Sequence, residues 1–177
     1  MRKSLLLAIL FTTMVQSQVL NDARVLLAGK MDIGLSAVRI NNSNGQSARI
    51  GIGLIRGADA EIVGTFEQDR YTIGVNTEIA LGYRPDISLT IGGHYQQTVK
   101  GLDATITISF PVNRFFSMYT GIDGDMILGS GSSQTPVWYF AGINSFLYRG
   151  FELFLEVDPG VAGPAASLFA AGLRLYF

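Results

Sequence analysis

Few side chains in this 177-residue chain could do chemistry, and the single histidine is the first of them. His94 could act as a general base together with Ser88, Asp103 or Asp123. A lone histidine more often belongs to a polar network than to a catalytic site. We therefore predict no catalytic residue, and we rank an enzyme that uses His94 last among the functional hypotheses.

Two aspartates suggest a metal site as a second possibility. Asp123 and Asp125 are two residues apart, so in a strand both would point to the same side. Calcium or magnesium would need further oxygen ligands, which the sequence does not specify. Buried charge is costly unless it is compensated, so we expect these aspartates to pair with Arg49, Arg84 or Arg174. The sequence thus predicts no metal and no cofactor.

Strands must position these side chains, because apolar residues recur with a period of two. In residues 71–83 the odd positions are apolar or aromatic apart from Thr77, whereas the even positions are small or polar. Twelve steps in a strand tilted by about 45° rise roughly 28 Å. Apolar bands of ~25 Å bounded by aromatic girdles are typical of transmembrane barrels, and Tyr71 and Tyr83 would belong to such a girdle.

The same alternation recurs in four later segments: 87–96, 102–110, 116–126 and 151–158. It is weaker before residue 70. Residues 137–148 are apolar on both faces, so their orientation stays open. The side opposite the apolar face carries the predicted polar network of the lumen: Glu78, His94, Asp103, Asp123, Asp125, Glu152, Glu156 and Arg174. Most of these residues are acidic, so the predicted lumen is acidic.

Turn-forming residues divide the chain into strands at nine breaks. The expected breaks are 41–45, 57–59, 67–70, 84–86, 99–101, 111–114, 129–136, 149–150 and 159–164. They give ten strands, or eight if one early hairpin is a loop. An even number places both termini at the periplasmic end, where we expect the short turns 84–86, 111–114 and 149–150.

The N-terminus predicts export. Arg2 and Lys3 precede an apolar stretch, and Ser17 offers the small residue before a cleavage site, so residues 1–17 are the predicted signal peptide. Residues 18–177 would form a single domain. Its net charge would be about −3, because cleavage removes the positive charges of Arg2 and Lys3. The sequence has no basic cluster, so we expect no nucleic-acid partner. No later segment is long and apolar enough for a membrane-spanning helix, which leaves strands to cross the bilayer.

The end of the chain carries a resemblance to a known class of proteins. Its last apolar face consists of Phe169, Ala171, Leu173, Leu175 and Phe177. This ending resembles the C-terminal targeting signal of outer-membrane barrels, with Gly172, Leu175 and Phe177 at matching positions. Leu175 replaces the more usual aromatic residue, and Ala170 stands where a polar residue is common. Small barrels similar to the OmpX and OmpA membrane domains are the closest family type.

The resemblance implies a location in the bacterial outer membrane, in contact with its lipid. It also implies periplasmic chaperones and the barrel-assembly machinery as partners. The oligomeric state stays open.

Together these patterns predict an all-β fold, a closed antiparallel up-and-down transmembrane barrel of ten strands. The first functional hypothesis is a structural or interaction role with a polar lumen filled by side chains. The alternative is a narrow pore with a weak preference for cations, because the lumen is acidic. A soluble exported sandwich would show the same alternation and is the alternative fold.

Overall fold

The computed structural model describes residues 22–177 except for residues 69, 98, 129–133, 149 and 164. The predicted signal peptide, residues 1–17, lies outside the described residues. Within the described residues, no helix has the length and apolar character needed to cross a membrane.

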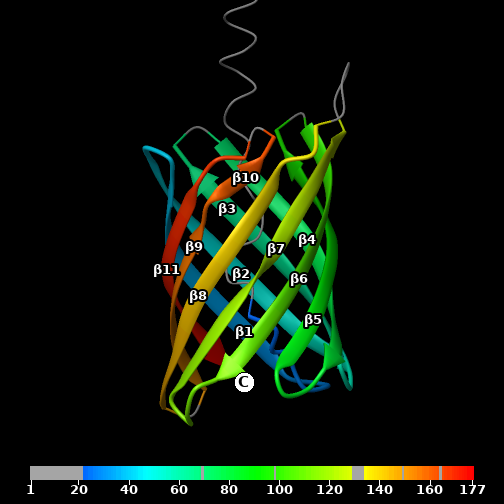
Figure 1. The fold of residues 1–177 in the computed structure, drawn as a ribbon, viewed down its shortest axis with the longest axis vertical. Coiled ribbons are helices and arrows are strands. Elements are labelled where there is room, and N and C mark those ends of the chain that lie inside the picture. Colours follow the sequence, from blue (N-terminus) through cyan, green and yellow to red (C-terminus); the bar gives the residue numbers. More distant parts are fainter. Residues whose placement is uncertain (1–21, 69, 98, 129–133, 149, 164) are drawn as a thin grey trace, which may run out of the picture.

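The described residues form eleven strands along the chain. Their bounds are β1 (Met31–Ile40), β2 (Ser43–Ile55), β3 (Ala58–Glu67), β4 (Arg70–Gly82), β5 (Asp86–Gln96), β6 (Val99–Pro111), β7 (Phe116–Leu128), β8 (Val137–Tyr148), β9 (Phe151–Asp158), β10 (Gly160–Ala162) and β11 (Leu168–Tyr176). Strands β1 to β8 each pair antiparallel with the next, and β11 pairs with both β9 and β1. The β1–β11 pairing closes the sheet into a barrel (Figure 1).

The short strand β10 follows β9 in the chain, and both strands pair with the same neighbour, β8. The backbone N–H of Tyr139 donates a hydrogen bond to the carbonyl of Pro159, and Gly160 lies opposite Trp138. Because β9 and β10 together occupy one place in the wall, the barrel has ten strands. The prediction of ten strands is confirmed, and the alternatives of eight strands and of a sandwich are wrong.

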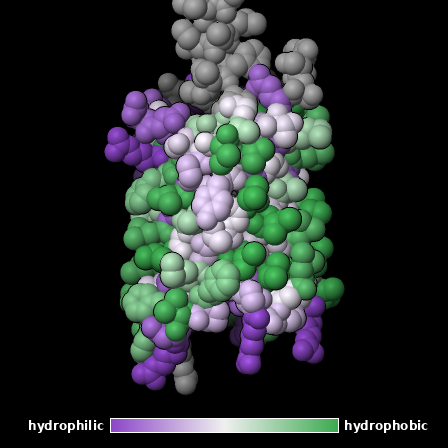
Figure 2. Space-filling model, viewed as in Figure 1, coloured by the Kyte–Doolittle hydropathy of each residue, from purple (hydrophilic) through white to green (hydrophobic). Residues whose placement is uncertain are grey.

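Alternation of side chains gives the wall its two faces. In β4, Thr72 and Asn76 are buried inside, whereas Tyr71, Ile73 and Val75 are exposed outside. Figure 2 shows apolar side chains over the middle of the wall and polar side chains gathered toward its ends. An apolar outer surface of this kind is suited to contact with lipid. Because lipid offers no hydrogen-bond partners, the closed sheet must pair the backbone N–H and C=O groups of every strand.

Several of the expected breaks are shorter than the sequence predicts, because residues at their edges belong to strands, and the break expected at 99–101 is displaced. The first hairpin turns at Asn41 and Asn42, so residues 43–45 belong to β2. The turn after β5 lies around Gln97, and residues 99–101 belong to β6. Asn41 and Gln97 adopt φ angles of 51° and 50°, the left-handed backbone of tight hairpin turns. Tight turns leave more residues to the strands than their polar composition indicates.

Strand β8, whose orientation the sequence leaves open, turns its largest aromatic side chains inward. Trp138 and Phe140 are buried, whereas Tyr139 and Ile143 are exposed on the outer face. The interior on this side therefore includes an apolar cluster, formed by Val38, Ile40, Tyr119, Phe140, Phe154, Ala166, Leu168 and Ala170.

Candidate functional site

The interior of the barrel collects most of the acidic residues of the chain. Twelve of the fourteen are buried: Asp22, Asp32, Asp59, Glu61, Glu67, Glu78, Asp103, Asp123, Asp125, Glu152, Glu156 and Asp158. Among the lysines and arginines that the structure describes, Arg49 and Arg174 are buried. Both lie toward the end of the barrel that carries the C-terminus. We call this part of the lumen the C-terminal half and the remainder the opposite half.

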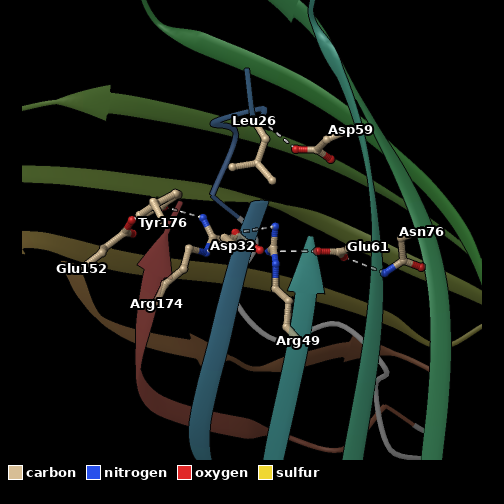
Figure 3. Close-up of polar contacts among 9 residues, drawn as sticks. All are labelled: Leu26, Asp32, Arg49, Asp59, Glu61, Asn76, Glu152, Arg174 and Tyr176. Carbon is tan, nitrogen blue, oxygen red and sulfur yellow. Dashed lines mark hydrogen bonds and ion pairs between the residues drawn. The ribbon is translucent and has the colours of Figure 1, made fainter. Parts of the chain in front are cut away.

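In the C-terminal half, Asp32 on β1 lies between two arginines (Figure 3). Its Oδ2 atom is 3.0 Å from Nε of Arg174 on β11 and 3.6 Å from Nη2 of Arg49 on β2. All three side chains are buried. The carboxylate and the two guanidinium groups compensate each other where water is excluded.

Further polar contacts extend this group in both directions (Figure 3). Nη1 of Arg49 lies 2.9 Å from Oε2 of Glu61, whose Oε1 accepts a 2.8 Å hydrogen bond from Nδ2 of Asn76. On the other side, Nη1 of Arg174 donates a 2.9 Å hydrogen bond to the Tyr176 hydroxyl, which donates to Glu152. We call this set the arginine network: Asp32, Arg49, Glu61, Asn76, Glu152, Arg174 and Tyr176.

The arginine network crosses the closure of the barrel. Its members come from β9, β11, β1, β2, β3 and β4, and the pairing of β1 with β11 joins the two ends of the chain. The side-chain contacts of Asp32 and Arg174 therefore reinforce the pairing that closes the barrel.

Residues 22–26 also enter the C-terminal half, as an irregular segment inside the wall, whereas residues 27–30 are exposed. The N–H of Leu26 donates a 2.8 Å hydrogen bond to Oδ2 of Asp59 (Figure 3). Ser109 Oγ accepts a 2.9 Å bond from the N–H of Ala23 and donates a 2.8 Å bond to Asp22. The sequence did not predict this placement, because contacts so far apart in the chain leave no local pattern.

In the opposite half, His94, Asp103 and Asp125 lie together on β5, β6 and β7. Asp103 faces Asp125 directly in the β6–β7 register, and His94 lies diagonal to Asp103 because it pairs with Gly101. Nδ1 of His94 is 3.3 Å from Oδ1 of Asp103. Each residue offers one nitrogen or oxygen atom, and these three atoms all lie within 4.8 Å of one another. All three residues are buried. We call this group the His94 site.

Glycines make room for the His94 site. A Cβ atom on Gly101 would collide with the His94 ring, so the imidazole lies across the glycine of the next strand. A Cβ on Gly92 would stand 2.7 Å from Oδ2 of Asp103 and would also collide with Asn76. Ring-on-glycine packing recurs where Tyr119 lies over Gly142 and Phe154 over Gly172.

The other partners considered for His94 lie differently. Ser88 is six residues away on the same strand, about 20 Å at ~3.3 Å per residue, so it forms no pair with the imidazole. Asp123 accepts a hydrogen bond from the Thr105 hydroxyl. Among the described residues, Arg49 and Arg174 form ion pairs with Asp32 and Glu61, and the expected pairing of Asp125 with Arg49, Arg84 or Arg174 is not seen.

The remaining predicted residues occupy separate places. Glu78 lies opposite Asp59, and Glu156 lies on β9 opposite Gly142, so neither joins the His94 site. Tyr71 and Tyr83 are exposed at the two ends of β4, where girdle residues are expected.

At the C-terminus, Gly172 lies beneath the Phe154 ring, whereas Leu175 and Phe177 face outward. Sequence reasoning left Asp32, Asp59 and Glu61 out of the predicted set. The alternation around Asp32 is a signal that could have included it, but residues 60–68 alternate too weakly to reveal Glu61.

Comparison with known proteins gives structural matches alone. No family model matches the sequence, and no curated protein matches it. An outer membrane channel from Pseudomonas putida F1 is similar in structure with a TM-score of 0.59 and 8% identity, covering 90% of this chain and 100% of that one. The KdgM porin is similar with a TM-score of 0.52 and 8% identity, covering 82% of this chain and 99% of that one. A complex of KdgM porin with disordered oligogalacturonate gives a TM-score of 0.55 with the same identity and coverage.

At such low identity the likeness concerns the fold alone. Its support is the continuous ten-stranded wall with a polar interior and an apolar exterior. The chain is therefore an outer-membrane-type β-barrel, similar in fold to porins and channels.

Proposed function

We propose that this protein is a bacterial outer-membrane barrel with a lumen filled by side chains, and that its role is structural or an interaction rather than conduction. The observation that carries this proposal is the burial of inward-facing residues. Trp138, Arg174, Tyr119, Phe140 and Glu152 each keep less than 2% of their surface exposed. A water-filled passage would leave accessible area on the residues that line it, and residues 22–26 occupy part of the remaining space.

Conductance in planar lipid bilayers tests the proposal. We expect no discrete current steps from the purified, folded protein. The double variant Trp138→Ala/Phe140→Ala is the matched control, because it removes two buried rings and should open a leak. Current steps from the unmodified protein, of a size similar to those of the double variant, would overturn the filled lumen.

A narrow pore with a preference for cations is the second candidate, supported by the twelve buried carboxylates against two buried arginines. The structural likeness to a porin and a channel also favours it. If the protein conducts, the reversal potential across a KCl gradient should shift in the direction of K⁺ selectivity. An anion-selective current would exclude this candidate.

We infer no catalytic role for His94, because Ser88, the candidate nucleophile, lies far along the strand, although Asp103 does contact the imidazole. His94→Ala should leave phospholipid and peptide hydrolysis unchanged from the unmodified protein. Hydrolysis by the unmodified protein that disappears in this variant would establish the enzyme hypothesis.

We further propose that residues 1–17 direct export and that Phe177 and the last strand are recognised by the barrel-assembly machinery, after delivery by periplasmic chaperones. Mass spectrometry of the mature protein should give an N-terminus at Gln18. Phe177→Ala should reduce the heat-modifiable fraction recovered in outer membranes. Phe66→Ala, which removes another exposed aromatic side chain, is the control and should assemble normally.

A further inference from the structure

We propose that the His94 site binds one divalent transition-metal ion of the zinc class, with His94, Asp103 and Asp125 as its protein ligands. The three residues come from adjacent strands, so the closed wall fixes their relative positions. The site would exist whether or not the lumen conducts, and it therefore goes beyond the proposed function.

Unpartnered oxygens supply a separate indication of a ligand. Oδ1 of Asp125 and Oδ2 of Asp103 are buried and accept no hydrogen bond from any described residue. Asp125 is 3% exposed and Asp103 is 2% exposed. Neither forms an ion pair with an arginine or lysine in the part of the chain that the structure describes. A buried carboxylate oxygen without a partner is costly, and a bound cation would reduce that cost.

The distances suit shared coordination. The 3.3 Å between Nδ1 of His94 and Oδ1 of Asp103 is longer than the usual N–H···O hydrogen bond. Two ligands about 2.1 Å from a tetrahedral zinc ion are separated by about 3.4 Å, close to the observed spacing. An oxygen of Asp125 completes the group, in which all three atoms lie within 4.8 Å of one another.

The donor set indicates which class of ion would bind. One imidazole nitrogen with two carboxylates suits zinc and its first-row neighbours, whereas calcium and magnesium prefer oxygen ligands throughout. Two aspartate charges also balance a divalent ion. Three protein ligands leave one tetrahedral position for water. Asp123, the next inward residue on β7, is held by Thr105 and adds negative potential beside the ion.

Gly101 acts as a positioning residue, because it gives the His94 ring its place against the wall. A methyl group there would push the ring away from Asp103. The small residue is thus part of the proposed site, although it offers no ligand atom.

Isothermal titration of the chelator-treated, detergent-solubilised barrel with zinc chloride tests the proposal. We expect one zinc ion per barrel, and a loss of affinity of at least tenfold in both His94→Ala and Asp125→Asn. The matched control is Glu78→Gln, which removes another buried, inward-facing carboxylate outside the site and should bind zinc as the unmodified protein does. Gly101→Ala should weaken binding while all three ligand residues remain.

Cobalt substitution gives a second measurement that does not depend on affinity. Bound Co²⁺ should show visible absorption typical of a low-coordinate site, and His94→Ala should abolish it. Heat-modifiable gel migration identifies folded variants, and His94→Gln replaces His94→Ala if the latter does not fold. The proposal is overturned if zinc does not bind at one equivalent, if ligand variants bind as the unmodified protein does, or if Glu78→Gln weakens binding equally.

Discussion

Asp32, in the C-terminal half of the lumen, lies 3.0 Å from Arg174, whereas Asp103 and Asp125 in the opposite half have no arginine or lysine in ion-pair contact among the described residues. The same strand alternation buries all three carboxylates. Their partners differ because Arg49 and Arg174 belong to the strands on either side of Asp32, while β5, β6 and β7 form another part of the wall. The arginine network therefore compensates Asp32 internally, whereas the His94 site is suited to an external cation.

The largest effect is expected where internal compensation crosses the barrel closure. Arg174→Leu removes the guanidinium that faces Asp32 and donates to Tyr176. Breaking a buried ion pair on one side costs about 3–5 kcal/mol, so the free energy of unfolding should fall by that amount. Urea unfolding in lipid vesicles measures it.

Arg56→Leu is the control, since Arg56 is exposed in the turn between β2 and β3. An exposed substitution of this kind should change stability by less than about 0.5 kcal/mol. If Arg174→Leu were as mild, the arginine network would not stabilise the closure, and the contrast between the two halves would lose its energetic basis.

Substitutions of buried glycines separate the effect of side-chain packing on stability from the effect of charge. Gly101→Ala in the opposite half and Gly142→Ala beneath Tyr119 each force a ring from its place. Overpacking costs about 1–3 kcal/mol, and we expect similar losses of unfolding free energy from both. Gly124→Ala is the control, because nothing lies within 4 Å of the added methyl group. Unequal losses would mean that the two ring-on-glycine contacts are not packed equally tightly.

The same substitution should have opposite signs in the two halves. Asp32→Asn removes a charge that two arginines share but keeps a side-chain acceptor, so it should destabilise the protein by about 1–3 kcal/mol. Asp125→Asn removes an uncompensated buried charge, so it should stabilise the metal-free protein by about 1 kcal/mol. Unfolding in the presence of a chelator measures both. A destabilising effect of Asp125→Asn under these conditions would show that its carboxylate already has a favourable partner.

The sequence predicts the wall better than it predicts contacts across the lumen. Alternation is local, so the ten strands and the inward position of His94 follow from neighbouring residues. Which inward residues meet depends on register between strands, which sets Asp103 opposite Asp125 and leaves Glu78 elsewhere. The sequence could not predict whether Trp138 points inward or outward, because both faces of its strand are apolar.

Residues 22–26 were also beyond prediction, since their partners Asp59 and Ser109 are distant in the chain. This segment supplies polar contacts to the C-terminal half through Ala23 and Leu26, which adds to the difference between the halves. Loss of single contacts should therefore loosen the segment without affecting zinc at the His94 site.

Ser109→Ala makes the smallest predicted change. It removes the acceptor of the Ala23 N–H and the donor to Asp22, each worth about 0.5–1.5 kcal/mol. Hydrogen exchange at the Ala23 amide should accelerate about tenfold, while zinc affinity stays unchanged. Ser117→Ala is the control, because the buried Ser117 hydroxyl has no hydrogen-bond partner among the described residues. Unchanged exchange would mean that packing of Leu26, rather than Ser109, holds the segment, whereas a change in zinc affinity would mean that the two halves of the lumen are coupled.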